Sequence, residues 1–124
     1  MKKLTRTDVA CRLAVPTHFF RGLLLPRFNG TSHFVDLKFK YKNQKMEFRC
    51  TKRKTGEYDK PVLTKGWLHF VRRERLKVGD KITLLQEEDQ DARTQFTIKV
   101  QKKIRLLGKD IWTDIFLKTL PARP

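Results

Sequence analysis

The strongest constraint on the fold is a stretch in which apolar and charged side chains alternate strictly. Between residues 35 and 41 the two kinds alternate without a break: Val35, Leu37, Phe39 and Tyr41 against Asp36, Lys38 and Lys40. A period of two is typical of a strand that buries one face and leaves the other in water. Met46, Phe48 and Cys50 repeat the period after a turn over Lys42–Gln44. The sequence therefore predicts a β-hairpin whose apolar face needs a core to pack against.

A second stretch, Pro61–Asp80, predicts a strand, a helix and a turn in that order. Its apolar residues Trp67, Phe70 and Val71 recur at the spacing of one helical face. Thr64 is predicted to cap the helix N-terminus, because its hydroxyl can accept a hydrogen bond from a free amide of the first turn. We interpret this helix as a plug in the fold that carries no chemistry of its own.

Short elements are predicted nearer the N-terminus. Arg12–Pro16 is predicted to be a short strand stopped by its proline, and Thr17–Arg21 to be one helical turn. Gly22 is predicted to end this turn in a left-handed conformation. Leu23–Pro26 is too short for a helix between a glycine and a proline, so a buried extended connection is predicted there.

Two more strands follow the central helix. One includes Ile82 and Leu84, the acidic run Glu87–Asp91 is predicted to be its turn, and the return strand alternates over Phe96–Val100. Seven short strands with two brief helices favour a small barrel over a sandwich, because the helices can close its open ends. The predicted fold class is therefore mainly β, a seven-stranded open β-barrel (pseudobarrel) with two short α-helices and a C-terminal extension.

That C-terminal stretch, Ile104–Leu120, fits two structures. Ile111 and Ile115 have helical spacing, whereas the β-branched and aromatic content from residue 111 to residue 117 favours a strand. Helix and strand stay open as alternatives. We expect one domain over residues 1–101 and a C-terminal extension over residues 102–124, packed on or next to the barrel.

The charge of the chain indicates what it binds. Lys and Arg number 29 against 13 Asp and Glu in 124 residues, which gives a formal net charge of +16. A polyanionic partner is the simplest reason for so basic a surface. No apolar run of membrane-spanning length and no apolar signal region are apparent, so we expect neither a membrane association nor secretion. Cys11 and Cys50 are expected to be small buried apolar residues rather than a disulfide.

Neither catalysis nor metal binding is predicted. His18, His33 and His69 are far apart in the sequence, and the cysteines lack the spacing of a zinc site. The sequence contains no glycine-rich phosphate loop and no serine nucleophile motif. We therefore expect no enzyme, no cofactor and no metal.

Two basic segments fall between predicted strands. Arg6 and Arg12 bracket a link that does not alternate, and Lys52-Arg53-Lys54 lies in a later loop. If the barrel brings both segments to one rim, they form two cationic fingers that can straddle a DNA groove and bind phosphates or guanine edges. The competing interpretation is that each charge run is only a solvated loop.

Several motifs resemble, in order and spacing, those of the plant B3 DNA-binding domain. They span residues 2–100 and comprise Leu4-Thr5-x-Thr7-Asp8-Val9, Arg12-Leu13-Ala14-Val15-Pro16, Phe48-Arg49, Leu63-Thr64-Lys65-Gly66-Trp67-x-x-Phe70-Val71 and Leu76-x-x-Gly79-Asp80. The resemblance implies a seven-stranded open β-barrel of the kind found in plant transcription factors. It also implies that an N-terminal and a C-terminal arm grip the major groove of DNA.

By the same resemblance, the N-terminal arm (N-arm) is Arg6–Arg12 and the C-terminal arm (C-arm) is Arg49–Tyr58. Arg53 and Arg49 are the first candidates for DNA contact. The full implied DNA-binding set is Arg6, Thr7, Arg12, Arg49, Thr51, Lys52, Arg53, Lys54, Thr55 and Tyr58. Better-known members often carry an aromatic residue and an Asn at the C-arm tip, where this chain has three cations, which favours phosphate contact over base reading.

We therefore expect a nuclear protein that binds double-stranded DNA in a sequence-specific manner and regulates transcription. A second copy or another transcription factor is an optional further partner. Two alternatives stay open. One is a binder of single-stranded nucleic acid or of phosphate backbone alone, for which only Tyr58 and Trp112 offer stacking surfaces. The other is a basic protein-interaction module that dimerises through residues 111–120. The DNA target, and activation as against repression, do not follow from the sequence.

Overall fold

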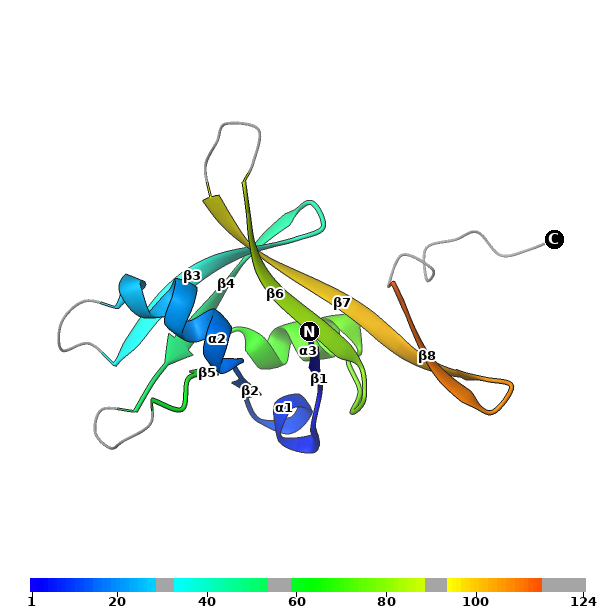
Figure 1. The fold of residues 1–124 in the computed structure, drawn as a ribbon. Coiled ribbons are helices and arrows are strands. Elements are labelled where there is room, and N and C mark those ends of the chain that lie inside the picture. Colours follow the sequence, from blue (N-terminus) through cyan, green and yellow to red (C-terminus); the bar gives the residue numbers. More distant parts are fainter. Residues whose placement is uncertain (29–32, 54–58, 89–93, 115–124) are drawn as a thin grey trace.

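The computed structural model describes residues 1–28, 33–53, 59–88 and 94–114, which fold mainly as β-structure (Figure 1). The strands are β1 Lys2–Lys3, β2 Leu13–Ala14, β3 Phe34–Tyr41, β4 Gln44–Thr51, β5 Val62–Leu63, β6 Lys81–Glu88, β7 Thr94–Leu106 and β8 Lys109–Asp114. The α-helices are α1 Arg6–Ala10, α2 Thr17–Phe19 and α3 Trp67–Glu74, and α2 continues as a π-helix over Phe20–Leu24 and a 3-10 turn over Leu25–Arg27.

Seven of the described strands follow one path through a curled, half-barrel sheet. Their order is β1-β6-β7-β3-β4-β5-β2, and β8 branches from this path by pairing with β7. The described pairings are antiparallel except for the parallel pair of β3 with β7. The mainly β, open-barrel fold class is confirmed. One difference is that the link predicted between the first two strands forms a helix, α1.

The strands β3 and β4 form the predicted hairpin. Leu37 lies opposite Phe48 and Phe39 opposite Met46, which joins the apolar positions of the two strands on one face. Lys42 takes a left-handed conformation in the turn, with φ of 55°. The alternation in the sequence is therefore the alternation between core and solvent.

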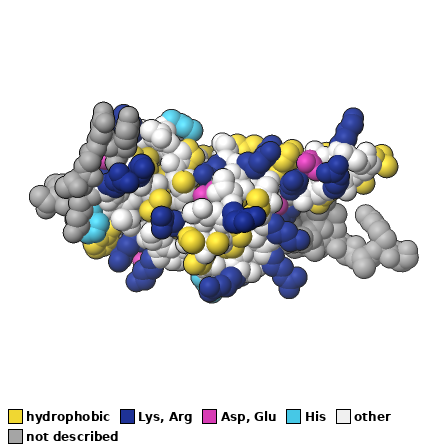
Figure 2. Space-filling view, turned by 90° about the horizontal axis from the view of Figure 1, so that it is seen from below, with side chains coloured by type: hydrophobic (Ala, Val, Ile, Leu, Met, Phe, Trp, Pro, Cys, Tyr) yellow, Lys and Arg dark blue, Asp and Glu magenta, His cyan; other side chains and the backbone are white. Residues whose placement is uncertain are grey.

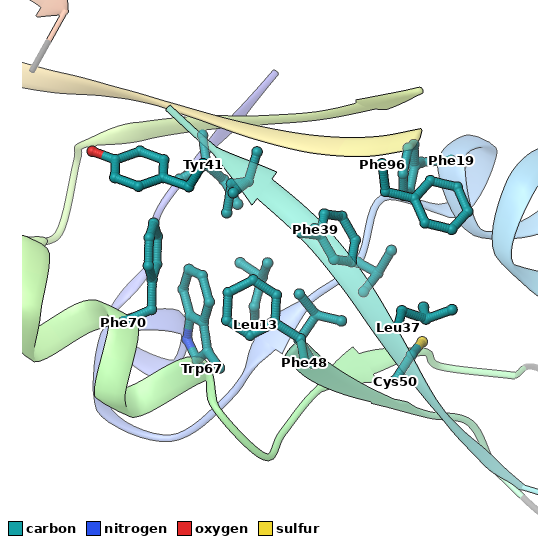
Figure 3. Close-up of a cluster of buried hydrophobic side chains, with 14 of the residues drawn as sticks. Leu13, Phe19, Leu37, Phe39, Tyr41, Phe48, Cys50, Trp67, Phe70 and Phe96 are labelled. Carbon is teal, nitrogen blue, oxygen red and sulfur yellow. The ribbon is translucent and has the colours of Figure 1, made fainter. Parts of the chain in front are cut away.

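The core lies between this hairpin and α3. Figure 3 shows the rings of Phe39, Phe48, Trp67 and Phe70 gathered in one cluster. The ring centroids of Phe48 and Phe70 are 5.7 Å apart, and those of Phe48 and Trp67 are 6.2 Å apart, both pairs edge to face, a favourable aromatic geometry. Trp67 has 0% of its surface exposed. Its helix therefore fills the interior of the half-barrel, as the interpretation of a plug requires.

Helix α3 begins at a glycine rather than at the predicted threonine cap. Gly66 is the N-cap, with φ of 91°. A Cβ atom at this position would lie 2.4 Å from the Glu47 carbonyl oxygen, so the close approach of β4 requires glycine. The Thr64 hydroxyl donates instead to the Arg49 carbonyl oxygen, 3.4 Å away. The prediction of a Thr64 cap was wrong because contacts with β4, and not local spacing, set the start of the helix.

The segment after Pro16 stays helical for longer than predicted. The π-helix and the 3-10 turn carry the chain through Gly22 to Arg27, and Gly22 is not among the residues of positive φ. Leu24 is fully buried in the core. The predictions of a left-handed Gly22 and of an extended Leu23–Pro26 were wrong, because a helical backbone places Phe20 and Leu24, four residues apart, on one buried face.

The C-terminal stretch is a strand as far as the structure describes it. Strand β8 pairs with β7 from Lys109 to Asp114, and residues 115–124 lie outside the described residues. Strand β7 runs without a break across residue 101, where the boundary of the domain was expected. The division at residue 101 stays a prediction.

Two smaller expectations need correction. The acidic residues Glu87 and Glu88 end β6 as strand residues and do not begin a turn, and residues 89–91 lie outside the described residues. Both cysteines are free, as expected, but only Cys50 is buried, whereas Cys11 is exposed. Cys11 follows α1 on the surface of the N-arm.

Candidate nucleic-acid interface

The N-arm is a short helix whose start is defined by a reciprocal pair of hydrogen bonds. The Thr5 amide donates to Asp8 Oδ2 over 2.8 Å, and the Asp8 amide donates to Thr5 Oγ1 over 3.2 Å. Such a capping box satisfies two amides that a helix start leaves without partners. The local sequence Thr5-x-x-Asp8 therefore explains why five residues form a helix here.

Asp8 also closes the arm. Its Oδ1 accepts from the Ala14 amide over 3.1 Å, and its Oδ2 lies 3.2 Å from Lys2 Nζ. Burial alone would raise the pKa of this carboxyl, which is 1% exposed, but the bonds from Thr5 and Ala14 and the Lys2 charge lower the pKa below its ordinary 3.8. Asp8 is therefore a charged clasp between the two ends of the N-arm.

Helix α3 holds the same arm from the core side. The indole Nε1 of Trp67 donates to the Asp8 carbonyl oxygen over 2.7 Å, between residues 59 positions apart in the chain. A buried indole N–H needs such a partner. The most buried aromatic residue of the core thus fixes the position of α1 relative to the sheet.

The C-arm leaves the sheet at the end of β4. The backbone of Arg49 is bonded on both sides to the segment before α3, since its amide donates to the Lys65 carbonyl over 3.0 Å and its carbonyl accepts from the Thr64 amide over 2.8 Å. The Lys52 amide donates to the His33 carbonyl over 2.8 Å, and the Arg53 amide to the Asp59 carbonyl over 2.7 Å. The described base of the C-arm is therefore ordered by backbone hydrogen bonds.

A groove of about 650 Å³ lies between the two arms. It brings together five of the residues predicted to bind DNA, namely Thr7 and Arg12 from the N-arm and Thr51, Lys52 and Arg53 from the C-arm. Lys2 and Lys60 also line it, although neither was among the residues predicted to bind DNA. Only their charge marked them in the sequence, because neither lies in a basic run of the arms.

The other predicted residues lie elsewhere or outside the described residues. Arg6 is exposed on α1 but does not line the groove. Arg49 is directed to the outer face of β4, where its guanidinium holds both carboxylate oxygens of Asp36 at 2.8 and 3.3 Å and lies 4.3 Å from the centroid of Phe34. The charge of Arg49 is thus engaged within the sheet. The three remaining residues, Lys54, Thr55 and Tyr58, lie outside the described residues.

The groove is electrostatically positive. Among the described residues, Arg12, Lys52, Arg53 and Lys60 have no carboxylate within ion-pair distance, and Lys2 shares the buried Asp8 carboxylate. Figure 2 shows the face on which α1 lies, with Lys and Arg side chains spread along its length and few acidic ones. Cations concentrated on a concave surface attract polyanions and accelerate their association.

The described residues include no cluster of three or more His, Cys, Asp or Glu side chains that could bind a metal ion. Within the same residues, no helix has the length and apolar character needed to cross a membrane.

Comparison with known proteins finds similarity of structure and none of sequence. No family profile matches the chain, and no curated protein sequence matches it. Among solved structures the chain is similar to the Arabidopsis FUS3–DNA complex, with a TM-score of 0.68 and 18% sequence identity over 82% of this chain and 93% of that one. The protein in that complex is a B3-domain protein. The chain therefore has a B3-like fold, which confirms the fold that the sequence motifs implied.

Proposed function

We propose that this chain, as a B3-like half-barrel, binds double-stranded DNA in the major groove through its N-arm and C-arm. The observation that supports this most is the groove between the arms, where Arg12, Lys52, Arg53 and Lys60 face one space without described carboxylate partners. The similarity to a protein solved in complex with DNA points the same way. We further propose that binding is sequence-specific and that the chain acts in the nucleus as a regulator of transcription rather than as an enzyme.

Within the groove we assign different roles to different cations. Lysine ammonium groups suit phosphate oxygens, whereas an arginine guanidinium can bind guanine O6 and N7 through two parallel hydrogen bonds. Arg53 and Arg12 are therefore the candidates for reading bases, and Lys2, Lys52 and Lys60 for phosphate contact. Arg49 is a weaker candidate than the sequence indicated, because contact with DNA would break its bonds to Asp36.

The first experiment removes the cations of the C-arm. The variant with Lys52, Arg53 and Lys54 all changed to Ala should keep its fold and bind duplex more weakly. The slope of log affinity against log salt concentration should fall by about 2 units, since the variant loses the phosphate contacts of two lysines and each contact removes about 0.9. Fluorescence anisotropy with a labelled duplex over a range of salt concentrations measures this slope.

A charge-matched control lies on the outer face of the sheet. Changing Lys38, Lys40 and Lys45 together to Ala removes the same charge from exposed strand positions outside the groove. This control should lose much less of the slope than the C-arm variant. Equal slopes for the wild type and the C-arm variant would contradict the proposal that the C-arm binds DNA.

Two further measurements separate the alternatives. Selection from random duplexes should recover a preferred sequence, and a flat base profile would leave only a phosphate-backbone binder. Unlabelled single strands should compete poorly with duplex, and strong competition would favour the single-strand alternative. Failure of the wild type to bind any duplex at low salt would favour the protein-interaction module.

A further inference from the structure

We propose that Lys3 of β1 and Lys81 of β6, which both lie beside the Trp112 ring, form a second phosphate-binding contact for the same duplex. This contact is on the side of the N-arm that faces away from the groove between the two arms. This inference rests on the proposed DNA binding and extends it to a surface that the two arms do not include. The contact would recognise phosphates that flank the major groove and would add affinity without reading bases.

The first observation is the position of Trp112. Strand β8 lies beside β7 and carries the chain back toward the barrel (Figure 1). The Trp112 indole Nε1 donates to the Gly79 carbonyl oxygen over 2.7 Å. This bond ties the C-terminal hairpin to the turn that precedes β6, and it fixes the ring over the outer face of the sheet.

The second observation is two like charges in direct opposition. Lys3 of β1 and Lys81 of β6 are cross-strand partners, so their side chains leave the sheet on the same face. Like charges directly opposite each other destabilise a strand pair. The Trp112 ring partly offsets this repulsion, since Lys81 Nζ lies 3.6 Å and Lys3 Nζ 5.1 Å from its centroid. An anion bound between the two ammonium groups would offset it further.

The neighbouring cations provide an internal contrast. On the same outer face, Lys99 pairs with Glu87, and both Lys103 and Arg105 pair with Asp110. Lys3 and Lys81 have no carboxylate partner among the described residues. Among the described outer-face cations of β1, β6, β7 and β8, these two ammonium groups are therefore the ones left available to an external anion.

The third observation is the position of Lys2 and Lys3 relative to the N-arm. Successive side chains of a strand point to opposite faces. Lys2 accordingly lines the groove and pairs with Asp8, while Lys3 is on the outer face. A helix is about 10–12 Å across and the major groove about 12 Å wide, so a duplex that holds α1 in its groove has phosphate strands on both sides of the arm. The cations between the two arms contact one of these phosphate strands, and Lys3 and Lys81 are placed to contact the other.

The test compares two charge-matched double variants. Changing Lys3 and Lys81 to Ala should lower the salt slope of duplex binding by about 1.8 units, at about 0.9 per phosphate contact. The loss of affinity between about 50 and about 200 mM salt should therefore shrink by about tenfold. The control variant, with Lys38 and Lys40 changed to Ala, removes equal charge from the outer face of β3 and should change the slope much less. The base profile from random-duplex selection should stay the same in both variants.

A second measurement reports on the site directly. The chain has two tryptophans, and Trp67 is fully buried. Quenching by acrylamide in the wild type, after subtraction of the Trp112→Phe variant, therefore reports the access of solvent to Trp112. Bound duplex should reduce this quenching.

The outcomes separate this inference from the proposed function. An unchanged slope in the Lys3/Lys81 variant, or unchanged quenching of Trp112, would overturn the second contact if the C-arm variant still loses slope. If the wild type binds no duplex, the proposed function fails first and the second contact fails with it. A reduced slope together with protected Trp112 supports a phosphate contact beyond the arms.

Discussion

The two arms beside the groove are held in different ways. The N-arm is a helix closed by one side chain, because the Asp8 carboxylate accepts from Thr5 at its start and from Ala14 beyond its end. The C-arm is a continuation of β4, and its described base is held by backbone groups, as in the bond from the Lys52 amide to the His33 carbonyl. One arm is thus a closed unit set on the barrel, and the other is part of the sheet itself.

This difference separates positioning from contact. In the N-arm the buried Asp8 holds the shape, while the exposed Arg12 is available to a ligand. In the C-arm the residues that face the groove are themselves extensions of the strand. Helix α3 supports both arms, since Trp67 bonds to the backbone of Asp8 and Gly66 lies against the Glu47 carbonyl of β4. We infer that α3 sets the distance between the arms, and the predictions below test the comparison of the two arms.

The largest effect is expected at Gly66, which supports the C-arm side. The change Gly66→Ala places a Cβ atom 2.4 Å from the Glu47 carbonyl oxygen, at a backbone φ of +91°. Left-handed strain and overpacking together should lower the free energy of unfolding by about 2–5 kcal/mol. Urea denaturation measures this loss. Duplex affinity of the folded fraction should also fall, because β4 must shift away from α3.

A glycine in open space is the matched control. Nothing lies within 4 Å of a Cβ atom built on Gly22, which is in a helical segment. Gly22→Ala should therefore stabilise the fold slightly, by about 0.5–1 kcal/mol. Equal stability losses in the two variants would show that the contact of α3 with β4 is not the reason that residue 66 is glycine.

The next effect in size is expected at Asp8, which supports the N-arm. In Asp8→Asn the amide group must turn a donor toward the amide of Thr5 or of Ala14, which should lower the free energy of unfolding by about 1–3 kcal/mol. Duplex affinity should fall as well, because the arm loses its clasp. Considered as charge alone, the same change removes a negative group beside the groove and should strengthen binding. Anisotropy titration distinguishes weaker binding, caused by loss of the clasp, from tighter binding, caused by loss of the negative charge. Tighter binding would contradict a positioning role for Asp8.

The acid dependence of stability provides a second check on Asp8. The pKa of Asp8 is lowered in the folded chain, so its stabilisation is complete above the ordinary value of 3.8 and is lost as the pH falls through the lower folded value. The wild type should therefore lose more stability than Asp8→Asn below about pH 4. Asp36→Asn is the control, since Asp36 pairs with Arg49 at the surface and its loss should change stability little.

Much of this architecture follows from short-range patterns. The alternation over β3 and β4 predicted both the hairpin and its buried face, because a half-buried strand has a period of two. The same reasoning places Arg49 on the outer face, since Phe48 and Cys50 on either side of it are buried. The resemblance located the C-arm by its motif and therefore could not reveal that Asp36, across the hairpin, already binds the guanidinium.

The remaining features depend on contacts between distant residues. The glycine cap at residue 66 depends on a carbonyl of β4, and the clasp of the N-arm on an amide beyond the helix. Lys2 and Lys60 reach the groove only because β1 and the segment before β5 pass beside it. The local sequence of each element contains no signal for such long-range contacts. The arm residues that face the groove could therefore be predicted, whereas Lys2, Lys60 and the supports of each arm could not.

The smallest effect is expected in the reactivity of two thiols, one from each arm, and it involves no change in the stability of the fold. Cys11 follows α1 and is exposed, whereas Cys50 lies in β4 at the base of the C-arm and is buried. Burial raises the pKa of the Cys50 thiol to about 12. Since the thiolate is the reactive form, a thiol reagent near pH 8 should modify Cys11 quickly and Cys50 only after unfolding.

Bound duplex sharpens the comparison of the two thiols. Because Cys11 adjoins Arg12, duplex in the groove should slow its modification, while Cys50 should stay unreactive with or without DNA. Cys11→Ser and Cys50→Ser assign the two rates, measured by the release of the coloured thiolate product. Rapid modification of Cys50 in the native chain would mean that β4 opens at the base of the C-arm. The C-arm would then open more readily than the N-arm, although its base is part of the sheet. The free energy of DNA binding by the C-arm would have to include the cost of ordering it.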